Sequence, residues 1–267
     1  MKLGEKVAII TGGGRGIGRA TALALAREGA AVVLAARTAA EIEAVAREVR
    51  SLGAQALPVV TDVTHEEDVA RLVQRTLDAF GRIDILVNNA GIGLPLRDVV
   101  DLNVEEWTRI LQINLTGPFL CAKAVLPTMI RQRSGKIINL ASLGGHVGVA
   151  GNSAYGASKA GLLLLTRCLA AEVKRYGIDV NAVSPSGTDT QLLHEMGRAG
   201  GRTNLMRPEE IANTILFLAS PESSAVTGTV IEAYGLSNPL FGPLTPAEVG
   251  PPPDSGTDDP STSPRSR

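Results

Sequence analysis

A tyrosine and a lysine stand four residues apart in the stretch SAYGASKAG, residues 153–161. Residues at positions i and i+4 lie on the same face of a helix, so Tyr155 and Lys159 are expected to be neighbours. A nearby ammonium favours the phenolate and lowers the tyrosine pKa from about 10, which would let Tyr155 donate and accept a proton near neutral pH. The alternative is an ordinary helix with one amphipathic pair.

A glycine-rich segment, TGGGRGIGRA, separates the first strand-like stretch from an alanine-rich helical one. Its spacing is T-G-x-x-x-G-x-G. Glycines let a backbone turn sharply and approach a pyrophosphate, and a helix N-terminus offers free N–H groups and a positive dipole. The segment therefore favours nucleotide binding. The alternative is a tight strand-to-helix turn that holds no ligand.

The composition excludes several classes of function. The 267 residues are 44% hydrophobic and 20% charged, with a formal net charge of −1, so nothing indicates a nucleic-acid or anionic-membrane partner. No apolar stretch approaches the ~20 residues that span a bilayer, and the N-terminus does not resemble a signal peptide. Cys121 and Cys168 lack metal-ligand spacing, so no metal site is expected. We expect a soluble cytoplasmic protein.

Short apolar segments alternate with longer amphipathic ones along most of the chain. This alternation predicts an α/β fold with a parallel sheet covered on both faces. The expected strands are residues 6–11, 31–36, 55–60, 84–89, 136–142 and 178–184. The expected helices are residues 19–29, 38–53, 66–81, 104–132, 153–176 and 208–219.

The composition changes near Asn238. The segment that follows is rich in proline and ends in serine, threonine, aspartate and proline. Such a segment buries too little apolar area to offset its ordering entropy. We therefore expect one folded domain over residues 1–238 and a mostly disordered tail over residues 239–267.

Five motifs together resemble the short-chain dehydrogenase/reductase family. They are TGGGRGIG at residues 11–18, NNAG at residues 88–91, Asn114, Ser142, and YGASK at residues 155–159. The resemblance covers roughly residues 3–236 and is strongest to the 3-oxoacyl-[acyl-carrier-protein] reductase group. It implies a single-domain, Rossmann-type, doubly wound parallel sheet of about seven strands with helices on both faces.

The resemblance also assigns catalytic roles. It implies that Tyr155 is the general acid when a ketone is reduced, and that Lys159 lowers the Tyr155 pKa and binds the nicotinamide ribose. Ser142 would hold the substrate carbonyl, and Asn114 would anchor a water that relays protons through Lys159. Taken alone, Ser142 could be a hydroxyl that caps a turn, and Asn114 could mark a helix kink.

The resemblance implies a cofactor site made from several loops, which also includes Tyr155 and Lys159. Asp62 would bind the adenine amino group, although its segment also reads as a helix N-terminal cap. The other cofactor residues implied are Gly12, Gly14, Arg15, Gly16, Ile17, Gly18, Arg37, Val63, Asn89, Ala90, Gly91, Pro185, Thr188 and Thr190.

The end of the second strand predicts NADP(H) rather than NAD(H). NAD-specific relatives usually carry an acidic residue there, and this chain has Ala36. The next residue is Arg37, whose guanidinium can pair with a 2′-phosphate, and Arg15 in the glycine loop is a second basic candidate. Either arginine alone could be a solvated surface charge.

The chain departs from the family pattern in three places. Ser186 stands where glycine is usual, which puts the backbone angles of its loop in doubt. The substrate lid over residues 191–207 is short and contains glycines, so it is expected to be mobile, and His194 within it is expected to face solvent. The altered C-terminus makes assembly as a homotetramer or dimer less certain.

The sequence leaves the substrate open. A small carbonyl compound or alcohol is expected, and a 3-oxoacyl thioester is one candidate. An acyl-carrier protein would then be a partner, with Arg131 and Arg133 as its contacts unless they form a solvated helix end. The alternatives are a dehydrogenase of a polyol, sugar or other alcohol, and a non-catalytic NADP-binding sensor.

Overall fold

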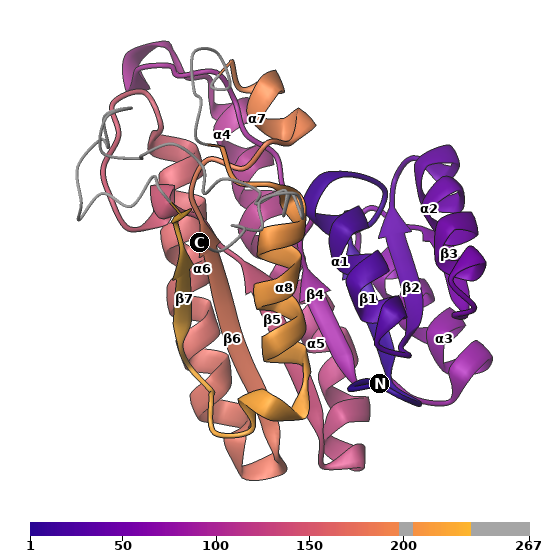
Figure 1. Ribbon diagram of the computed structural model, residues 1–267. Coiled ribbons are helices and arrows are strands. Elements are labelled where there is room, and N and C mark those ends of the chain that lie inside the picture. The colour runs from indigo at the N-terminus through magenta and orange to yellow at the C-terminus, as the bar shows by residue number, and fades with distance from the viewer. Residues whose placement is uncertain (198–204, 236–267) are drawn as a thin grey trace, which may run out of the picture.

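The computed structural model describes residues 1–197 and 205–235, and seven parallel strands form its sheet (Figure 1). The strand order is β3-β2-β1-β4-β5-β6-β7, which confirms the predicted fold class. The expected tail lies outside the described residues, so the domain boundary at residue 238 stays a prediction. The strands are β1 (Val7–Thr11), β2 (Ala31–Ala36), β3 (Ala56–Val60), β4 (Ile85–Asn88), β5 (Gly135–Leu140), β6 (Ile178–Pro185) and β7 (Val230–Ala233).

Helices cover both faces of the sheet. Helices α1, α2 and α8 pack on one face, and α3, α5 and α6 pack on the other. Short 3-10 turns η1 (Val99–Asp101), η3 (Leu143–Gly145), η4 (Lys174–Tyr176) and η5 (Pro221–Ser223) lie in the connections. The helices are α1 (Gly16–Arg27), α2 (Ala39–Ser51), α3 (Glu66–Phe80), α4 (Val104–Leu111), α5 (Gly117–Gln132), α6 (Ser153–Val173), α7 (Gln191–Glu195) and α8 (Pro208–Ala219).

Strand β1 shows why the strand segments are apolar without alternation. Ala8 and Ile10 pack in the cluster under α1, α2 and α8, while Val7 and Ile9 pack in the cluster under α3, α5 and α6. All four side chains are at most 3% exposed. Because successive side chains point to opposite faces, a strand that is covered on both faces must be apolar at every position.

The strand order places a crevice above β1. Strand β1 pairs with β2 on one side and with β4 on the other, and the chain crosses over in opposite directions from it. In open α/β sheets this switch point leaves a crevice outside the carboxyl ends of the strands, where ligands bind. The glycine loop lies between β1 and α1, directly at that crevice.

The helical stretch Val104–Gln132 is interrupted. A π-helical turn, η2 (Gln112–Thr116), joins α4 to α5. Contrary to the expectation from sequence, this stretch is long and apolar enough to cross a membrane by length and composition alone. However, α5 packs against the sheet through Cys121, Val125 and Met129, which are at most 2% exposed. We therefore describe the stretch as a core helix.

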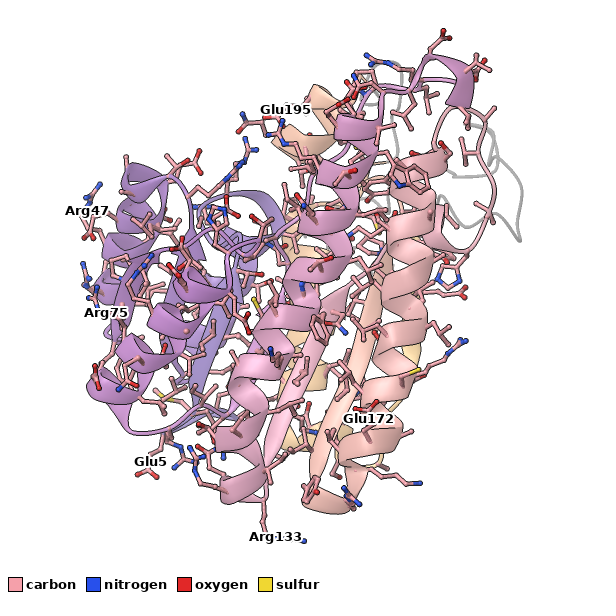
Figure 2. All side chains as sticks on the ribbon, turned by 180° about the vertical axis from the view of Figure 1, so that it is seen from behind. Glu5, Arg47, Arg75, Arg133, Glu172 and Glu195 are labelled. Atoms are coloured by element: carbon pink, nitrogen blue, oxygen red, sulfur yellow. The ribbon has the colours of Figure 1, made fainter. Side chains whose placement is uncertain are left out.

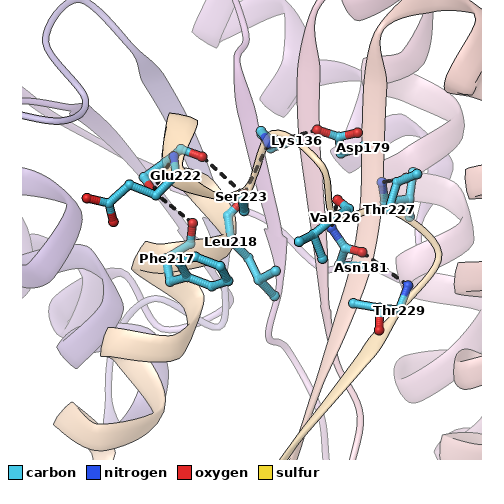
Figure 3. A network of polar contacts seen from close by, with 12 residues as sticks. Lys136, Asp179, Asn181, Phe217, Leu218, Glu222, Ser223, Val226, Thr227 and Thr229 are labelled. Atoms are coloured by element: carbon cyan, nitrogen blue, oxygen red, sulfur yellow. Dashed lines mark hydrogen bonds and ion pairs between the residues drawn. The ribbon is translucent and has the colours of Figure 1, made fainter.

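The amino ends of β5 and β6 are tied to the connection that precedes β7 (Figure 3). The Lys136 ammonium lies 2.7 Å from an Asp179 carboxylate oxygen and 3.1 Å from the Ser223 hydroxyl. The Asn181 side chain donates to the Val226 carbonyl at 2.9 Å and accepts from the Thr229 amide at 3.2 Å. These bonds fix the connection from α8 and so position β7 at the edge of the sheet.

A buried carboxylate ties together the amino ends of β1 and β4. Asp84 is 4% exposed and accepts hydrogen bonds from the Val7 amide at 3.0 Å and from the Arg82 guanidinium at 2.7 and 2.8 Å. The Lys6 ammonium lies 3.3 Å away. Burial opposes ionisation, but these donors outweigh it and hold the pKa of Asp84 below its usual value.

We predict that Asp84→Asn lowers the unfolding free energy by about 2 kcal/mol at pH 7, because bonds to a charged group are lost. A lowered carboxyl pKa stabilises the fold above the unfolded value of about 3.9, and the effect is lost as pH falls through the folded value. Urea unfolding of both proteins at pH 7 and at about pH 3 tests this. If the difference in unfolding free energy between the two proteins does not shrink at the lower pH, the lowered pKa assigned to Asp84 is contradicted.

Candidate functional site

A cleft of about 340 Å³ opens at the carboxyl ends of the strands. Its wall contains most of the cofactor residues expected from sequence. They are Gly12, Gly14, Arg15, Gly16, Ile17, Arg37, Asp62, Val63, Asn89, Ala90, Gly91 and Thr190. Segments far apart in the chain therefore converge on one cavity, and its lower wall is the glycine loop.

The glycine loop fits an anion. Helix α1 has no acidic residue in its first turn, and its N-cap residue, Arg15, makes no capping bond with its side chain. The first N–H groups of α1 are therefore available to a phosphate. Gly12 has a φ of 64°, which favours glycine. This donor set fits the pyrophosphate of a dinucleotide.

Gly18 has a packing role and is absent from the cleft wall. A Cβ at this position would lie 2.1 Å from the Gly12 carbonyl oxygen and 2.6 Å from Asn89 Nδ2. Helix α1 can therefore approach the loop only without a side chain here. Gly18 therefore shapes the loop by packing against Gly12 and Asn89, and its expected contact with the cofactor stays a prediction.

Asn89 holds the loop in place from β4. Its side-chain amide donates to the carbonyl oxygens of Thr11 at 2.9 Å and Gly12 at 3.0 Å. The Thr11 hydroxyl in turn accepts from the main-chain amides of Asn89 and Ala90, both at 3.1 Å. Thr11 thus joins the two motifs that form the cleft, a role that sequence reasoning missed although the threonine opens the glycine motif.

Asp62 stands on the cleft wall and closes a turn. One carboxylate oxygen accepts from the Thr64 amide at 3.0 Å and from the Thr64 hydroxyl at 2.7 Å. Burial raises its pKa, but these bonds and the charge of Arg37 outweigh burial, so the pKa of Asp62 is lowered. The N-cap of α3 is His65, so the alternative reading of Asp62 as the helix cap is wrong.

The end of the cleft beside β2 contains charges of both signs. Arg37 lines it as expected, together with Ala36 and Thr38, and so does Glu41 from the first turn of α2. A Cβ at Gly14 would lie 2.8 Å from Glu41 Cβ. Sequence reasoning missed Glu41 because it looked for an acid on the strand, whereas this acid comes from the following helix turn.

Lys159 is buried beneath the cleft. Its side chain is 4% exposed, and its ammonium donates to the Leu140 carbonyl oxygen at 2.7 Å. Burial lowers the pKa of Lys159 to about 8. The ammonium lies 5.8 Å from the centroid of the Tyr155 ring, so the expected neighbourhood of the two side chains is observed.

Asn114 secures the helix turn that carries Tyr155. Its amide nitrogen donates to the Ser158 hydroxyl at 3.1 Å, and that hydroxyl donates to the Tyr155 carbonyl oxygen at 2.7 Å. The Asn114 side chain also bonds the main chain of Ile92 in both directions at 2.9 Å. Asn114 lies in the π-helical turn η2, and such turns occur frequently at functional sites.

Gly91 shows how close Asn114 and Lys159 lie. A Cβ at Gly91 would stand 3.3 Å from Asn114 Oδ1 and 3.6 Å from Lys159 Nζ. The two polar groups therefore face the same point on the cleft wall. Ser158, which links Asn114 to the tyrosine helix, was missed from sequence, although it lies within the quoted stretch around Tyr155.

Ser142 begins the turn that covers the tyrosine helix. Its hydroxyl oxygen accepts from the Gly144 amide at 3.2 Å, which is the capping role considered as an alternative. An accepting hydroxyl keeps its own proton to donate, so capping leaves Ser142 able to bind a carbonyl. A Cβ at Gly144 would lie 3.4 Å from Tyr155 Cε1, so this turn packs against the tyrosine ring.

Besides Gly18, the expected cofactor residues Tyr155, Lys159, Pro185 and Thr188 are also absent from the cleft wall. Pro185 ends β6 opposite Ala233, and Thr188 is 5% exposed and bridges to Met206. Neither is among the residues that line the cavity. Both support the loop that leads to Thr190, which does line it. Ser186 does not have a positive φ, so serine replaces the usual glycine there without backbone strain.

His194 is paired at the surface. Its ring nitrogen lies 2.9 Å from Asp189 Oδ1, and both side chains are at least 60% exposed. It therefore faces solvent, as expected. Residues 198–204 of the expected lid lie outside the described residues. In the ranges that the structure describes, no group of three histidine, cysteine, aspartate or glutamate side chains is arranged to hold a metal ion.

We predict that Lys159→Met raises the unfolding free energy at pH 7 by about 1–2 kcal/mol. Lowering the ammonium pKa from 10.5 to about 8 costs roughly 3 kcal/mol, and the lost bond to Leu140 offsets about 1 kcal/mol of that. The cost is present in full below about pH 8 and declines as pH rises toward the unfolded pKa, so the gain should shrink at pH 10.

Thermal unfolding at the two pH values measures this gain. Lys123→Met is the matched control, because Lys123 is 57% exposed and pairs with a surface glutamate. Unchanged stability of Lys159→Met at pH 7 would contradict the assigned burial cost.

Comparisons with known proteins agree with this geometry. Residues 6–200 match the short chain dehydrogenase family. The chain is 44% identical to a cis-4-hydroxycyclohexanecarboxylate dehydrogenase of Sinomonas cyclohexanicum, over 86% of this chain and 96% of that protein. It is 39% identical to a 3-oxoacyl-[acyl-carrier-protein] reductase of Thermotoga maritima, over 88% and 98%.

The solved structures include close neighbours of the fold. The crystal structure of levodione reductase superposes with a TM-score of 0.82 at 36% identity, covering 86% of this chain and 96% of that one. A short-chain type dehydrogenase/reductase from Mycobacterium marinum superposes with a TM-score of 0.84 at 37% identity, covering 89% and 97%. The chain belongs to the short-chain dehydrogenase/reductase family of oxidoreductases.

Proposed function

We propose that this protein interconverts a carbonyl and a secondary alcohol, with NADP(H) as the hydride carrier. The observation that carries the proposal is the buried Lys159 ammonium, which lies beside the Tyr155 ring and shares the cleft wall at Gly91 with Asn114. A cationic group next to a phenol supports proton transfer by that phenol. The bound nicotinamide would supply or accept the hydride.

The residues of this chain supply position and a proton. Tyr155 donates the proton to the carbonyl oxygen in reduction and removes it in oxidation. Ser142 donates a second hydrogen bond to that oxygen and so polarises the carbonyl. Lys159 stabilises the tyrosinate electrostatically, while Asn114 holds the helix turn through Ser158. The non-catalytic sensor stays the weaker alternative, because all four of the expected catalytic residues are present.

We predict that Tyr155→Phe retains the fold and cofactor binding but reduces turnover by about 10² to 10⁴, the usual contribution of a general acid. The assay is reduction of a panel of ketones, with circular dichroism and cofactor titration as controls. Turnover within a factor of about three of the wild type would show that another group supplies the proton.

The cofactor preference is inferred from charge. Ala36 ends β2 without an acid, and Arg37 and Arg15 both line the adjoining part of the cleft. Two guanidinium groups support binding of a 2′-phosphate. Glu41 lines the same region and opposes it, so the preference reflects the balance of these charges. NAD(H) is the less favoured cofactor.

We predict that wild-type kcat/KM is more than tenfold higher with NADP(H) than with NAD(H), since charge-assisted hydrogen bonds contribute about 1.5–3 kcal/mol each. Ala36→Asp combined with Arg37→Ile should shift the preference toward NAD(H), because an acid then accepts the ribose hydroxyls. Equal values for the two cofactors in the wild type, or a preference for NADH, would contradict the proposal.

Two substrate classes have support. Relatives named 3-oxoacyl-[acyl-carrier-protein] reductases support a 3-oxoacyl thioester. A relative named for a hydroxycyclohexanecarboxylate, and the levodione reductase structure, support a cyclic alcohol or ketone as a second candidate. Turnover of thioester and cyclic substrates side by side separates the two.

An acyl-carrier protein stays a possible partner, but the two arginines suggested from sequence are misplaced for it. Arg131 and Arg133 lie at the end of α5, just before β5 begins. That is the amino end of the sheet, and Figure 2 shows Arg133 at the opposite end of the molecule from Glu195. A carrier bound there would be far from Tyr155, so any docking surface must lie elsewhere.

Assembly as a homotetramer or dimer also belongs to the proposal. Phe119 on α5 and Leu164 on α6 are 45% and 61% exposed, which leaves large apolar side chains on the outer surface of these helices. Exposed apolar side chains of this kind support contact with a second copy. A cytoplasmic location is proposed with it, on the composition of the chain.

A further inference from the structure

An ion pair crosses the mouth of the cofactor cleft. Arg15, from the glycine loop, places its Nη1 atom 3.0 Å from Glu195 Oε1, and its Nη2 atom lies 3.5 Å from Oε2. Glu195 is the last residue of α7. Figure 2 shows it at the end of the molecule opposite Arg133, which is the end where the cleft opens. Both nitrogen atoms at the tip of the Arg15 guanidinium therefore face one carboxylate.

Glu195 is held in this position by its neighbours. Thr190 lines the cleft and caps α7, with its hydroxyl accepting from the Leu193 amide at 3.3 Å. Met196, the residue after Glu195, is 5% exposed and packs against Gly93 so tightly that a Cβ at Gly93 would overlap its sulfur. These two contacts place α7 beside the glycine loop, with the Glu195 carboxylate within reach of Arg15.

Arg15 is also one of the two arginines that support NADP(H). A guanidinium fork pairs bidentately with one anionic group at a time. A 2′-phosphate that binds Arg15 must displace the Glu195 carboxylate or lie beside it as a like charge. A ribose that carries only a 2′-hydroxyl meets neither cost. Glu195 on α7 therefore weakens binding of a ribose with a 2′-phosphate and leaves binding of a ribose with a 2′-hydroxyl unaffected.

We propose that Glu195 is a specificity-determining residue that competes with the 2′-phosphate for Arg15 and so reduces the preference of the cleft for NADP(H) over NAD(H). The proposal rests on the proposed use of a nicotinamide dinucleotide. It adds a residue from α7 to the set that discriminates between the two cofactors, whereas the sequence drew attention only to Arg15, Ala36 and Arg37.

The alternative is a surface ion pair without influence on binding. Arg15 and Glu195 are 44% and 47% exposed, and exposed pairs usually contribute little to stability. The chain contains a matched pair for comparison. Arg50 and Glu43 on α2 are 2.9 Å apart and 45% and 44% exposed, and neither lines the cleft. Glu43→Gln therefore removes an equivalent carboxylate away from the proposed site.

The test is binding of ADP-ribose and of its 2′-phosphate, measured by calorimetry on the full-length wild type, Glu195→Gln and Glu43→Gln. These ligands differ only in the phosphate and need no turnover. We expect Glu195→Gln to bind the phosphorylated ligand about three- to fivefold more tightly, with ADP-ribose changed by less than about 1.5-fold. The gain should shrink in high salt. Glu43→Gln should match the wild type.

A double-mutant cycle shows whether the effect passes through Arg15. In an Arg15→Met background, Glu195→Gln should change the affinity for the phosphorylated ligand by less than about 1.5-fold. If Glu195→Gln raises the affinity for the phosphorylated ligand equally with and without Arg15, the effect is general charge repulsion, and the proposal is overturned. The proposal is also overturned if the ratio of the affinities for ADP-ribose and its 2′-phosphate is the same in Glu195→Gln as in the wild type.

These outcomes are separate from the proposed cofactor preference. The preference is read from the wild type alone, as the ratio of its affinities for the two ligands. The role of Glu195 is read from the change in that ratio. A wild type that does not favour the phosphorylated ligand would contradict the preference, and a ratio that rises in Glu195→Gln would then still support competition for Arg15. Thermal unfolding of each variant confirms that the fold is retained.

Discussion

The hydrogen bond from the Lys159 ammonium to the Leu140 carbonyl oxygen joins helix α6 to the end of strand β5. An ammonium that is 4% exposed needs acceptors that replace the water it has lost, and the Leu140 carbonyl oxygen is one such acceptor at 2.7 Å. Gly145 allows the turn after Ser142 to lie on α6, since a Cβ there would be 2.8 Å from the Lys159 carbonyl carbon. The close packing of α6, β5 and η3 thus follows from where one charge is placed.

The same placement explains why polar groups cluster on this side of α6. Asn114 in the π-helical turn reaches both the Ile92 main chain and Ser158, so it joins the loop after β4, η2 and α6 close to the buried ammonium. A regular α-helix from residue 104 to 132 would rotate the residues after the turn by about 100°, the angle of one residue. The π turn therefore adjusts which side chain faces the site.

Much of the fold and of the site was predictable because the relevant signals are local. Two-sided burial makes β2 and the first four residues of β1 apolar, and glycines mark the loop at the end of β1. The Tyr155 and Lys159 spacing places both side chains on one helix face. A break in the helix at Asn114 was among the readings of the sequence, but its π-helical form was not predictable, since one extra residue hardly alters an apolar pattern. The positions of Glu41 and Glu195 depend on how α2 and α7 pack against the loop, which no local pattern encodes.

Two polar networks lie at the other end of the strands, away from the cleft. Asp84 closes the amino ends of β1 and β4, and Lys136 with Asp179 and Ser223 closes those of β5 and β6. β6 has eight residues, so the two ends stand roughly 26 Å apart at 3.3 Å per residue. Changes at such a distance combine additively. The loops at the carboxyl ends of the strands can therefore be replaced while the bonds at the amino ends keep the sheet intact. This makes the chain suited to grafting of substrate loops between relatives.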